Sequence, residues 1–339
     1  MFDVCLILPY LPEAAWKNDL REKESLALGY LTAFLKKNGF NVVSINAELL
    51  KWSPQRIYEE ILSYQDCRLI GISCTSQRLY EATKMIAKLL KQKQENLHIT
   101  VGGIFPTVAD QEILNDCTAI DSIVRGEGEL TLLDLPLHIC KQMPTENILG
   151  LISRKGDKII VYPSRPRMQD LDMLPWPDRK DLEYLCSKNN RNFNVYIMSS
   201  RGCYGCCSFC SIGSFYKNHQ RHQRSPENVV GEIEYLVKNF RVNRFQFVDD
   251  VFIDLSPKRV NWVKKFCNII RNKKLKIHFY TEIRPDAIRD DIIRDLRNAG
   301  LETVFLDIES GVDRILKRYN KGVTEKQNGR LYKHLKRLA

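Results

Sequence analysis

Four of the 11 cysteines of this chain lie in one short segment, SRGCYGCCSFCS, which spans residues 200–211. They are Cys203, Cys206, Cys207 and Cys210, and the other seven are dispersed along the chain. An isolated cysteine in an apolar run behaves as a small buried hydrophobe. In a cytosolic protein, a cluster this tight indicates metal binding or catalysis rather than disulfide bonds.

A short irregular loop of this kind can supply three thiolates to a cubane iron–sulfur cluster, which leaves one iron open to a small molecule. Gly202 and Gly205 permit the backbone angles that such a loop needs. Other interpretations stay open: a zinc site completed by His219 and His222, a thioredoxin-like pair, or a chance cluster of buried cysteines. A structural zinc site usually separates its two cysteine pairs by a sizeable loop, whereas the two pairs abut here.

The second half of the chain alternates strand-like and helix-like patterns, and the cysteine segment follows the first of these strands. Repeated strand–helix units predict a TIM-like parallel (β/α) barrel, whose active site lies at the carboxyl ends of the strands. The units present cannot close an eight-stranded barrel, so we expect an open, partial barrel, truncated at the C-terminus. The expected strands are 194–200, 244–249, 276–282 and 302–308, and the expected helices are 226–239, 257–272, 289–299 and 324–337.

The first half shows the same alternation, with continuous apolar strands and crossover helices. Such strands predict a parallel sheet covered on both faces, which is a doubly wound α/β domain. Ligands of such folds bind beyond the carboxyl ends of the strands. The expected strands are 2–9, 40–45, 69–74, 99–101 and 122–124, and the expected helices are 25–38, 54–64, 80–92 and 110–115.

Length and composition set the remaining bounds. The 339 residues suffice for two domains, which we place at 1–150 and 191–339, with a hairpin and a proline-rich linker at 151–190. No stretch approaches the roughly 20 apolar residues of a membrane-spanning helix, and the start does not resemble a signal peptide, so we expect a cytoplasmic protein. The net charge of +11 comes from scattered basic residues without a nucleic-acid-binding motif, so we do not expect a nucleic-acid partner.

The spacing Cys-x3-Cys-x2-Cys in the cysteine segment resembles the defining signature of the radical S-adenosylmethionine (radical SAM) superfamily. Members of that superfamily fold as a partial (β/α) barrel, with the cysteine loop after the first strand. The resemblance implies that Cys203, Cys207 and Cys210 bind a 4Fe-4S cluster, and that Cys206 is a bystander. It also implies that S-adenosylmethionine (SAM) binds the open iron, with Phe209 near its adenine.

Charged residues at the ends of the later strands match further positions of that family. They are Asp249 and Asp250 after the second strand, Glu282 and Arg284 at the end of the third, and Glu309 at the end of the fourth. The resemblance implies that the two aspartates contact the methionine amino group and that the other three approach its carboxylate and the ribose. Each residue taken alone is equally consistent with a helix cap or a solvated charge.

Residues 1–150 resemble the Rossmann-like cobalamin-binding domain that precedes the barrel in one branch of the family, through the segments LGYLTA (28–33), GISCTS (71–76), VGGIFPT (101–107) and VRGEGE (124–129). No histidine precedes His98, so the family's Asp-x-His-x-x-Gly motif is absent and cobalamin would bind without a protein histidine. A degenerate domain that binds nothing is the alternative. The implied cobalamin contacts are Ser73, Cys74, Thr75, Ser76, Gly102, Gly103 and Thr107.

The resemblance also implies the reaction. One electron, from a donor such as flavodoxin or ferredoxin, cleaves SAM to methionine and a 5′-deoxyadenosyl radical, which takes a hydrogen atom from a small-molecule substrate. With cobalamin, this favours methyl transfer to an unactivated carbon, and we expect no catalytic residue beyond the cofactor ligands. The alternatives are a cobalamin-dependent radical cyclase or rearrangement enzyme, a non-catalytic remnant that binds cobalamin or a cluster, and a zinc-binding module.

Overall fold

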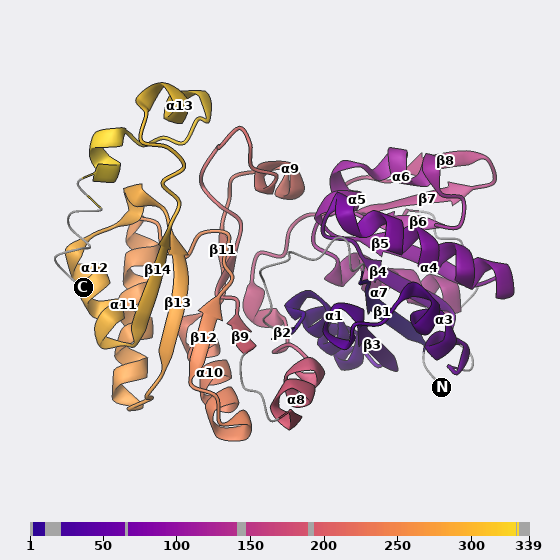
Figure 1. The fold of residues 1–339 in the computed structure, drawn as a ribbon, viewed down its shortest axis with the longest axis horizontal. Coiled ribbons are helices and arrows are strands. Elements are labelled where there is room, and N and C mark those ends of the chain that lie inside the picture. Colours follow the sequence, from indigo (N-terminus) through magenta and orange to yellow (C-terminus); the bar gives the residue numbers. More distant parts are fainter. Residues whose placement is uncertain are drawn as a thin grey trace. The chain divides into compact units, whose positions relative to one another are not determined.

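The computed structural model describes residues 3–10, 22–64, 67–140, 147–188, 193–329 and 331 (Figure 1). The chain divides into two compact units. The first comprises Met1–Met168 with Leu174–Phe193, and the second comprises Gln169–Met173 with Asn194–Ala339. Within the described ranges, no helix has both the length and the apolar composition that crossing a membrane would require.

The first unit is built on one sheet with the strand order β3-β1-β4-β5-β6-β7-β8. The pairs from β3 to β6 are parallel, whereas β7 and β8 add to the edge in antiparallel fashion. This arrangement confirms the predicted parallel sheet. The strands are β1 (Val4–Leu8), β3 (Val42–Asn46), β4 (Leu69–Ser73), β5 (His98–Gly102), β6 (Ser122–Val124), β7 (Leu151–Lys155) and β8 (Lys158–Val161).

Strand β1 shows why this sheet is covered on both faces. All of its residues are buried, and they divide alternately between two apolar clusters: Cys5 and Ile7 join one, whereas Val4, Leu6 and Leu8 join the other. Successive side chains of a strand point to opposite faces, so the sheet has a core on each side. The helices of this unit are α1 (Leu26–Lys37), α2 (Ala47–Leu50), α3 (Pro54–Leu62), α4 (Tyr80–Lys93), α5 (Ile104–Val108), α6 (Asp110–Asp116), α7 (Glu129–Cys140) and α8 (Lys180–Ser187).

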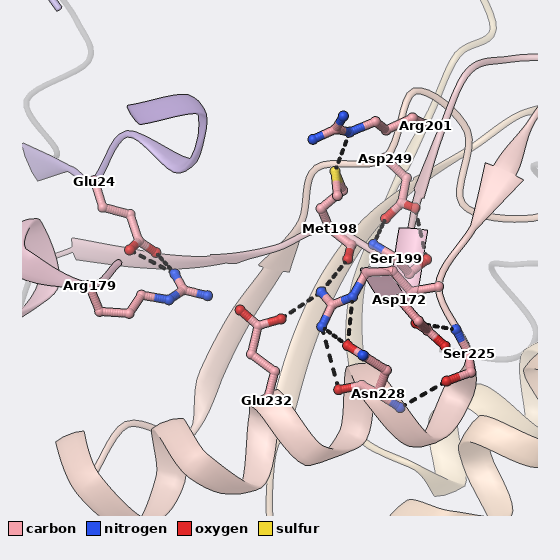
Figure 2. A network of polar contacts seen from close by, with 11 residues as sticks. Glu24, Asp172, Arg179, Met198, Ser199, Arg201, Ser225, Asn228, Glu232 and Asp249 are labelled. Carbon is pink, nitrogen blue, oxygen red and sulfur yellow. Dashed lines mark hydrogen bonds and ion pairs between the residues drawn. The ribbon is translucent and has the colours of Figure 1, made fainter. Parts of the chain in front are cut away.

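The segment expected to link the two domains belongs largely to the first unit. The hairpin β7–β8 forms and extends the first sheet, and helix α8 occupies part of the expected linker. The buried guanidinium of Arg179 binds both carboxylate oxygens of Glu24 (Figure 2). Nη1 of Arg179 lies 2.7 Å from each of these oxygens. This ion pair joins the residues before α8 to the start of the first unit.

The second unit repeats strand and helix. Strands β9 (Phe193–Ile197), β12 (Arg244–Phe247), β13 (His278–Ile283) and β14 (Leu301–Leu306) pair in parallel in chain order. A short antiparallel pair, β10 (Ser200–Arg201) with β11 (His222–Gln223), follows β9 and flanks helix α9 (Ile212–Tyr216). The later helices are α10 (Pro226–Phe240), α11 (Pro257–Asn272), α12 (Asp290–Asn298) and α13 (Asp313–Arg318).

Helices α10 and α11 start where the sequence predicts because each begins with Ser-Pro. The hydroxyl of Ser225 accepts a hydrogen bond from the backbone N–H of Asn228, and that of Ser256 accepts one from the N–H of Arg259. Serine at the cap and proline at the first helical position are both favourable. The predicted helix at 324–337 is described only in part: residues 325–329 and 331 are helical, and residues 330 and 332–337 lie outside the described residues.

Candidate active site

The cysteine loop (residues 202–211) connects β10 to α9, beyond the carboxyl end of β9. Cys203 and Cys207 are half-buried, whereas Cys206 and Cys210 are exposed, and none of the four forms a disulfide. The N–H of Cys210 donates to the carbonyl of Cys207 at 3.1 Å, which closes the turn between these two cysteines. The loop therefore lies where active sites of such α/β units form, as the sequence predicts.

Two of the predicted ligand sulfurs share one charged neighbour. Nη1 of Arg284 lies 3.5 Å from Sγ of Cys207. A Cβ added at Gly205 would lie 2.8 Å from the same nitrogen and 3.4 Å from Sγ of Cys203, whose sulfur also accepts the N–H of Gly205. Burial raises the pKa of the Cys203 thiol, against the opposing effects of this N–H and of Arg284.

The donor set suits an iron–sulfur cluster. Among the residues that the structure describes, no three His, Cys, Asp or Glu side chains surround a point where a single metal ion would sit. Cysteine thiolates from one short segment are the ligand type that iron–sulfur clusters take. Nη1 of Arg284 lies 3.5 Å from Sγ of Cys207, and the charge of Arg284 also lowers the pKa of Cys203 against the effect of burial. These residues fit an anionic, thiolate-bound group.

His219, considered for a zinc site, has another partner. Its Nδ1 lies 2.9 Å from the carbonyl oxygen of Gly205, within the cysteine loop. The other candidate, His222, is buried in β11, which pairs with β10. His219 therefore contacts the backbone of the loop.

A segment that the sequence analysis missed lies against the cysteine loop. This bracing segment, residues 318–321, begins at the last residue of α13. Its carbonyls at Arg318 and Tyr319 accept hydrogen bonds from the hydroxyl and the N–H of Ser208, respectively. The side chain of Asn320 donates to the carbonyl of Cys206 at 2.9 Å. The ring of Tyr319 meets that of Phe209 edge-on, with 5.2 Å between centroids. No local pattern in the sequence indicates these contacts.

The two aspartates after β12 have different surroundings. Asp249 is buried, and its carboxylate accepts hydrogen bonds from the N–H and hydroxyl of Ser199 (Figure 2). It also accepts one from the hydroxyl of Ser200. Asp250 accepts the N–H of Gly202 at 2.7 Å, directly before Cys203. Asp250 thus reaches the cysteine loop, whereas the carboxylate of Asp249 is enclosed by the end of β9.

Acidic side chains gather at the ends of β13 and β14. Burial, followed by the charges of Asp307 and Asp250, raises the pKa of Glu282. Burial also raises the pKa of Asp307; the charge of Lys321 opposes this effect, and the charge of Glu309 adds to it. Glu309 itself has φ of 60°, a left-handed conformation that is unusual outside glycine and is found at functional sites. This concentration of negative charge favours a cationic ligand.

Lys321 is a site residue that the sequence analysis did not identify. Its side chain is 3% exposed, and its Nζ donates to Oε1 of Glu309 at 2.9 Å. Its carbonyl oxygen accepts a hydrogen bond from Nη2 of Arg284 at 2.6 Å. Lys321, the last residue of the bracing segment, therefore connects this segment to Glu309 after β14 and to Arg284 after β13.

In the first unit, the loops after β4 and β5 pack directly on each other. Gly103 has φ of 116°, and a Cβ there would lie 2.7 Å from the carbonyl oxygen of Cys74. The N–H of Cys74 donates to the carbonyl of Gly102 at 2.8 Å. Both glycines are among the cobalamin contacts that the family resemblance implies. At Gly103, the close approach that requires glycine comes from the protein backbone.

The other residues of these loops divide into supporting and accessible ones. The thiol of Cys74 lies in the core, and burial raises its pKa to about 11. The hydroxyl of Thr107 donates to the carbonyl of Gly103 and accepts the N–H of Gly126, so it ties the loops after β5 and β6 together. Residues with an accessible surface are Ser73, Thr75, Ser76, Gly102 and Gly103, whereas Cys74 and Thr107 are buried.

Two family models match the chain: the B12 binding domain at residues 22–135 and the radical SAM superfamily at residues 197–338. An uncharacterized methyltransferase of Pyrococcus horikoshii is 29% identical over 96% of this chain and 69% of its own length. An anaerobic magnesium-protoporphyrin IX monomethyl ester cyclase of Synechocystis is 30% identical over 84% of this chain and 56% of its own. The chain therefore spans between about half and two thirds of the length of these relatives.

Solved structures share the fold. OxsB, a cobalamin-dependent SAM radical enzyme, matches 97% of this chain and 46% of its own, with a TM-score of 0.79 and 21% identity. TsrM, a radical SAM methyltransferase of Kitasatospora setae, matches 98% of this chain and 64% of its own, with a TM-score of 0.80 and 17% identity. The predicted fold class, a Rossmann-like domain followed by a partial TIM-like barrel, is confirmed.

Proposed function

Because this chain belongs to the radical SAM superfamily, in the branch that joins a cobalamin-binding domain to the barrel, we propose that it is an enzyme that transfers a methyl group to an unactivated carbon. The proposal depends mainly on one observation: a three-cysteine loop at the carboxyl end of β9 contacts Asp250 and Arg284 from the next two strand ends, in a chain that also carries the cobalamin-binding domain. The methyltransferase among its relatives supports methyl transfer.

In this proposal, Cys203, Cys207 and Cys210 hold a 4Fe-4S cluster. When bound, the cluster and SAM supply a 5′-deoxyadenosyl radical, and cobalamin carries the methyl group. The residues of the chain bind and orient these groups and keep water away from them. The half-buried position of Cys203 and Cys207 suits this role.

SAM would bind beside the open iron. Asp250, Glu282 and Glu309 provide negative charge for its sulfonium and ammonium groups, and Lys321 fixes Glu309 in place. The ring of Phe209, which is 54% exposed and braced by Tyr319, is available to pack against adenine.

Cobalamin would bind at the loops after β4 and β5. Ser73, Thr75 and Ser76 offer accessible polar side chains there, beside the partly exposed Gly102. Cys74, Gly103 and Thr107 act indirectly, because they hold these loops in shape.

A radical cyclase or rearrangement enzyme is the second candidate. Relatives named as anaerobic magnesium-protoporphyrin IX monomethyl ester cyclases, from Synechocystis and Rubrivivax gelatinosus, favour it. Mass spectrometry of the product separates the two, because methyl transfer adds one carbon. In either case we propose a cytoplasmic enzyme with a small-molecule substrate and an external one-electron donor such as flavodoxin or ferredoxin.

Anaerobic reconstitution tests the proposal. We expect the wild-type chain to bind iron, sulfide and cobalamin, and to form 5′-deoxyadenosine from SAM in the presence of a reductant. Cys203→Ala should lose the cluster and form 5′-deoxyadenosine only at background level. Cys206→Ala is the matched control from the same loop and should retain both. Full 5′-deoxyadenosine formation by Cys203→Ala would refute the assignment.

A further inference from the structure

Most N–H groups of the Arg284 guanidinium already bind other residues of this chain. Its Nε and Nη2 bind the two carboxylate oxygens of Asp286 at 3.0 Å each, and Nη2 also donates to the carbonyl of Lys321 at 2.6 Å. Nη1 lies 3.5 Å from Sγ of Cys207. A guanidinium has five N–H donors, so these contacts engage four of them, and the side chain is 5% exposed. Little of Arg284 is left for a carboxylate of SAM.

The guanidinium is also fixed from the side of the cysteine loop. It lies over the ring of Tyr204, 5.1 Å from the centroid, and the hydroxyl of Tyr204 donates to Asp286 at 3.1 Å. The missing side chain of Gly205 leaves the space that Nη1 fills, since a Cβ there would be 2.8 Å away. Tyr204 and Gly205, which lie between Cys203 and Cys207, therefore both help to fix the position of this guanidinium.

We propose that Arg284 is a positioning residue of the iron–sulfur loop rather than a contact of SAM. It holds the turn from Cys203 to Cys207 in a form that can receive the cluster, and it places a fixed positive charge beside the ligand sulfurs. It also joins the loop to the end of β13 and, through Lys321, to the bracing segment. The inference rests on the proposed function, because it requires that these cysteines bind a cluster.

The physical consequence concerns both the affinity and the reduction potential of the cluster. Partners that orient metal ligands typically contribute about 10–100-fold to metal affinity. Hydrogen bonds to the sulfurs and nearby charge also set the potential of an iron–sulfur cluster. A positive charge stabilises the reduced, more negative state, so its removal should lower the midpoint potential.

The test compares Arg284→Met and Arg284→Lys with wild type after anaerobic reconstitution. For Arg284→Met we expect iron loss to a chelator about 10-fold faster or more, and a lower midpoint potential in a redox titration followed by electron paramagnetic resonance. Arg284→Lys keeps the positive charge but lacks the planar guanidinium that binds two oxygens at once. This variant should therefore lose iron faster than wild type, while the midpoint potential of its cluster stays nearer to the wild-type value.

Arg289→Met is a matched control. Arg289 binds Asp291 with the same Arg-x-Asp geometry, with Nε and Nη2 at 3.0 and 2.6 Å from the two oxygens, but this pair is exposed and lies outside the cysteine loop. Its loss should change neither iron retention nor potential. It therefore separates an effect on the loop from a general loss of an ion pair.

Gly205→Ala is an independent probe that leaves every charge in place. Its Cβ would displace Nη1 of Arg284 or Sγ of Cys203, so iron should again be lost faster. This variant and Arg284→Lys keep the proposal testable if Arg284→Met does not fold.

The possible outcomes are distinct. A wild-type chain that binds no cluster overturns both the proposed function and this inference. A wild-type chain that binds the cluster, with Arg284 variants of unchanged iron retention and potential, overturns the inference alone. If these variants keep the cluster properties but lose affinity for SAM, Arg284 is a SAM contact instead.

Discussion

Gly103 illustrates how one residue can be required by its surroundings. Its φ of 116° and ψ of −172° fall in a region that is essentially restricted to glycine, and a Cβ would meet the carbonyl of Cys74 at 2.7 Å. We therefore expect Gly103→Ala to lower the free energy of unfolding by about 3 kcal/mol or more, as measured by urea denaturation.

Gly156→Ala is the control for this prediction. Gly156 has a positive φ of 58°, but an added Cβ would have nothing within 4 Å. Its substitution should lower the free energy of unfolding by only about 1 kcal/mol, the usual penalty for a left-handed alanine. Equal effects at the two positions would mean that the contact with Cys74 is unimportant.

Glu232 provides a second prediction at the residue scale. It forms an ion pair at 2.5 Å with Arg224, and both side chains are almost completely buried. Removing one charge of a buried pair leaves the other uncompensated. Glu232→Gln should therefore lower the free energy of unfolding by about 3–5 kcal/mol in urea.

The same helix supplies the control for Glu232. Glu227, also on α10, pairs with Lys265 at 2.6 Å, but both of these side chains are more than half exposed. Exposed pairs contribute about 0–1 kcal/mol, so Glu227→Gln should be close to neutral. A similar loss in both variants would contradict the role of burial.

At the scale of elements, helix α11 depends on its first turn. The hydroxyl of Ser256 accepts the N–H of Arg259, so Ser256→Ala leaves that donor without its cap. We expect a loss of about 1 kcal/mol in the free energy of unfolding, measured in urea, with recovery in Ser256→Asp. No recovery by aspartate would indicate that the hydroxyl acts other than as a cap.

Local patterns predicted most elements but not all. Ser-Pro starts and apolar periodicity sufficed for α10 and α11. Helix α7 was missed because Pro136 lies inside it, and proline removes a helical hydrogen bond. Its Leu132 and Leu135 are buried in the core of the first unit, so tertiary packing compensates for the poor local propensity.

At the scale of the whole molecule, the two units have separate cores and separate candidate sites. We therefore predict that Cys203→Ala loses iron but retains cobalamin, with the same cobalt per chain as wild type. Metal analysis of iron and cobalt on the same anaerobic preparation checks this. Loss of both metals in this variant would mean that cobalamin binding depends on the cluster.

The sequence by itself determined most of the strands and helices, the family and the position of the cysteine loop, because these follow from local periodicity and from spacing within one short segment. Only the tertiary structure decided what surrounds that loop. Arg284 contacts Cys207, which is 77 residues away in the sequence, and Lys321, which is 37 residues away. Such contacts depend on how distant strand ends come together, and no local pattern records that arrangement.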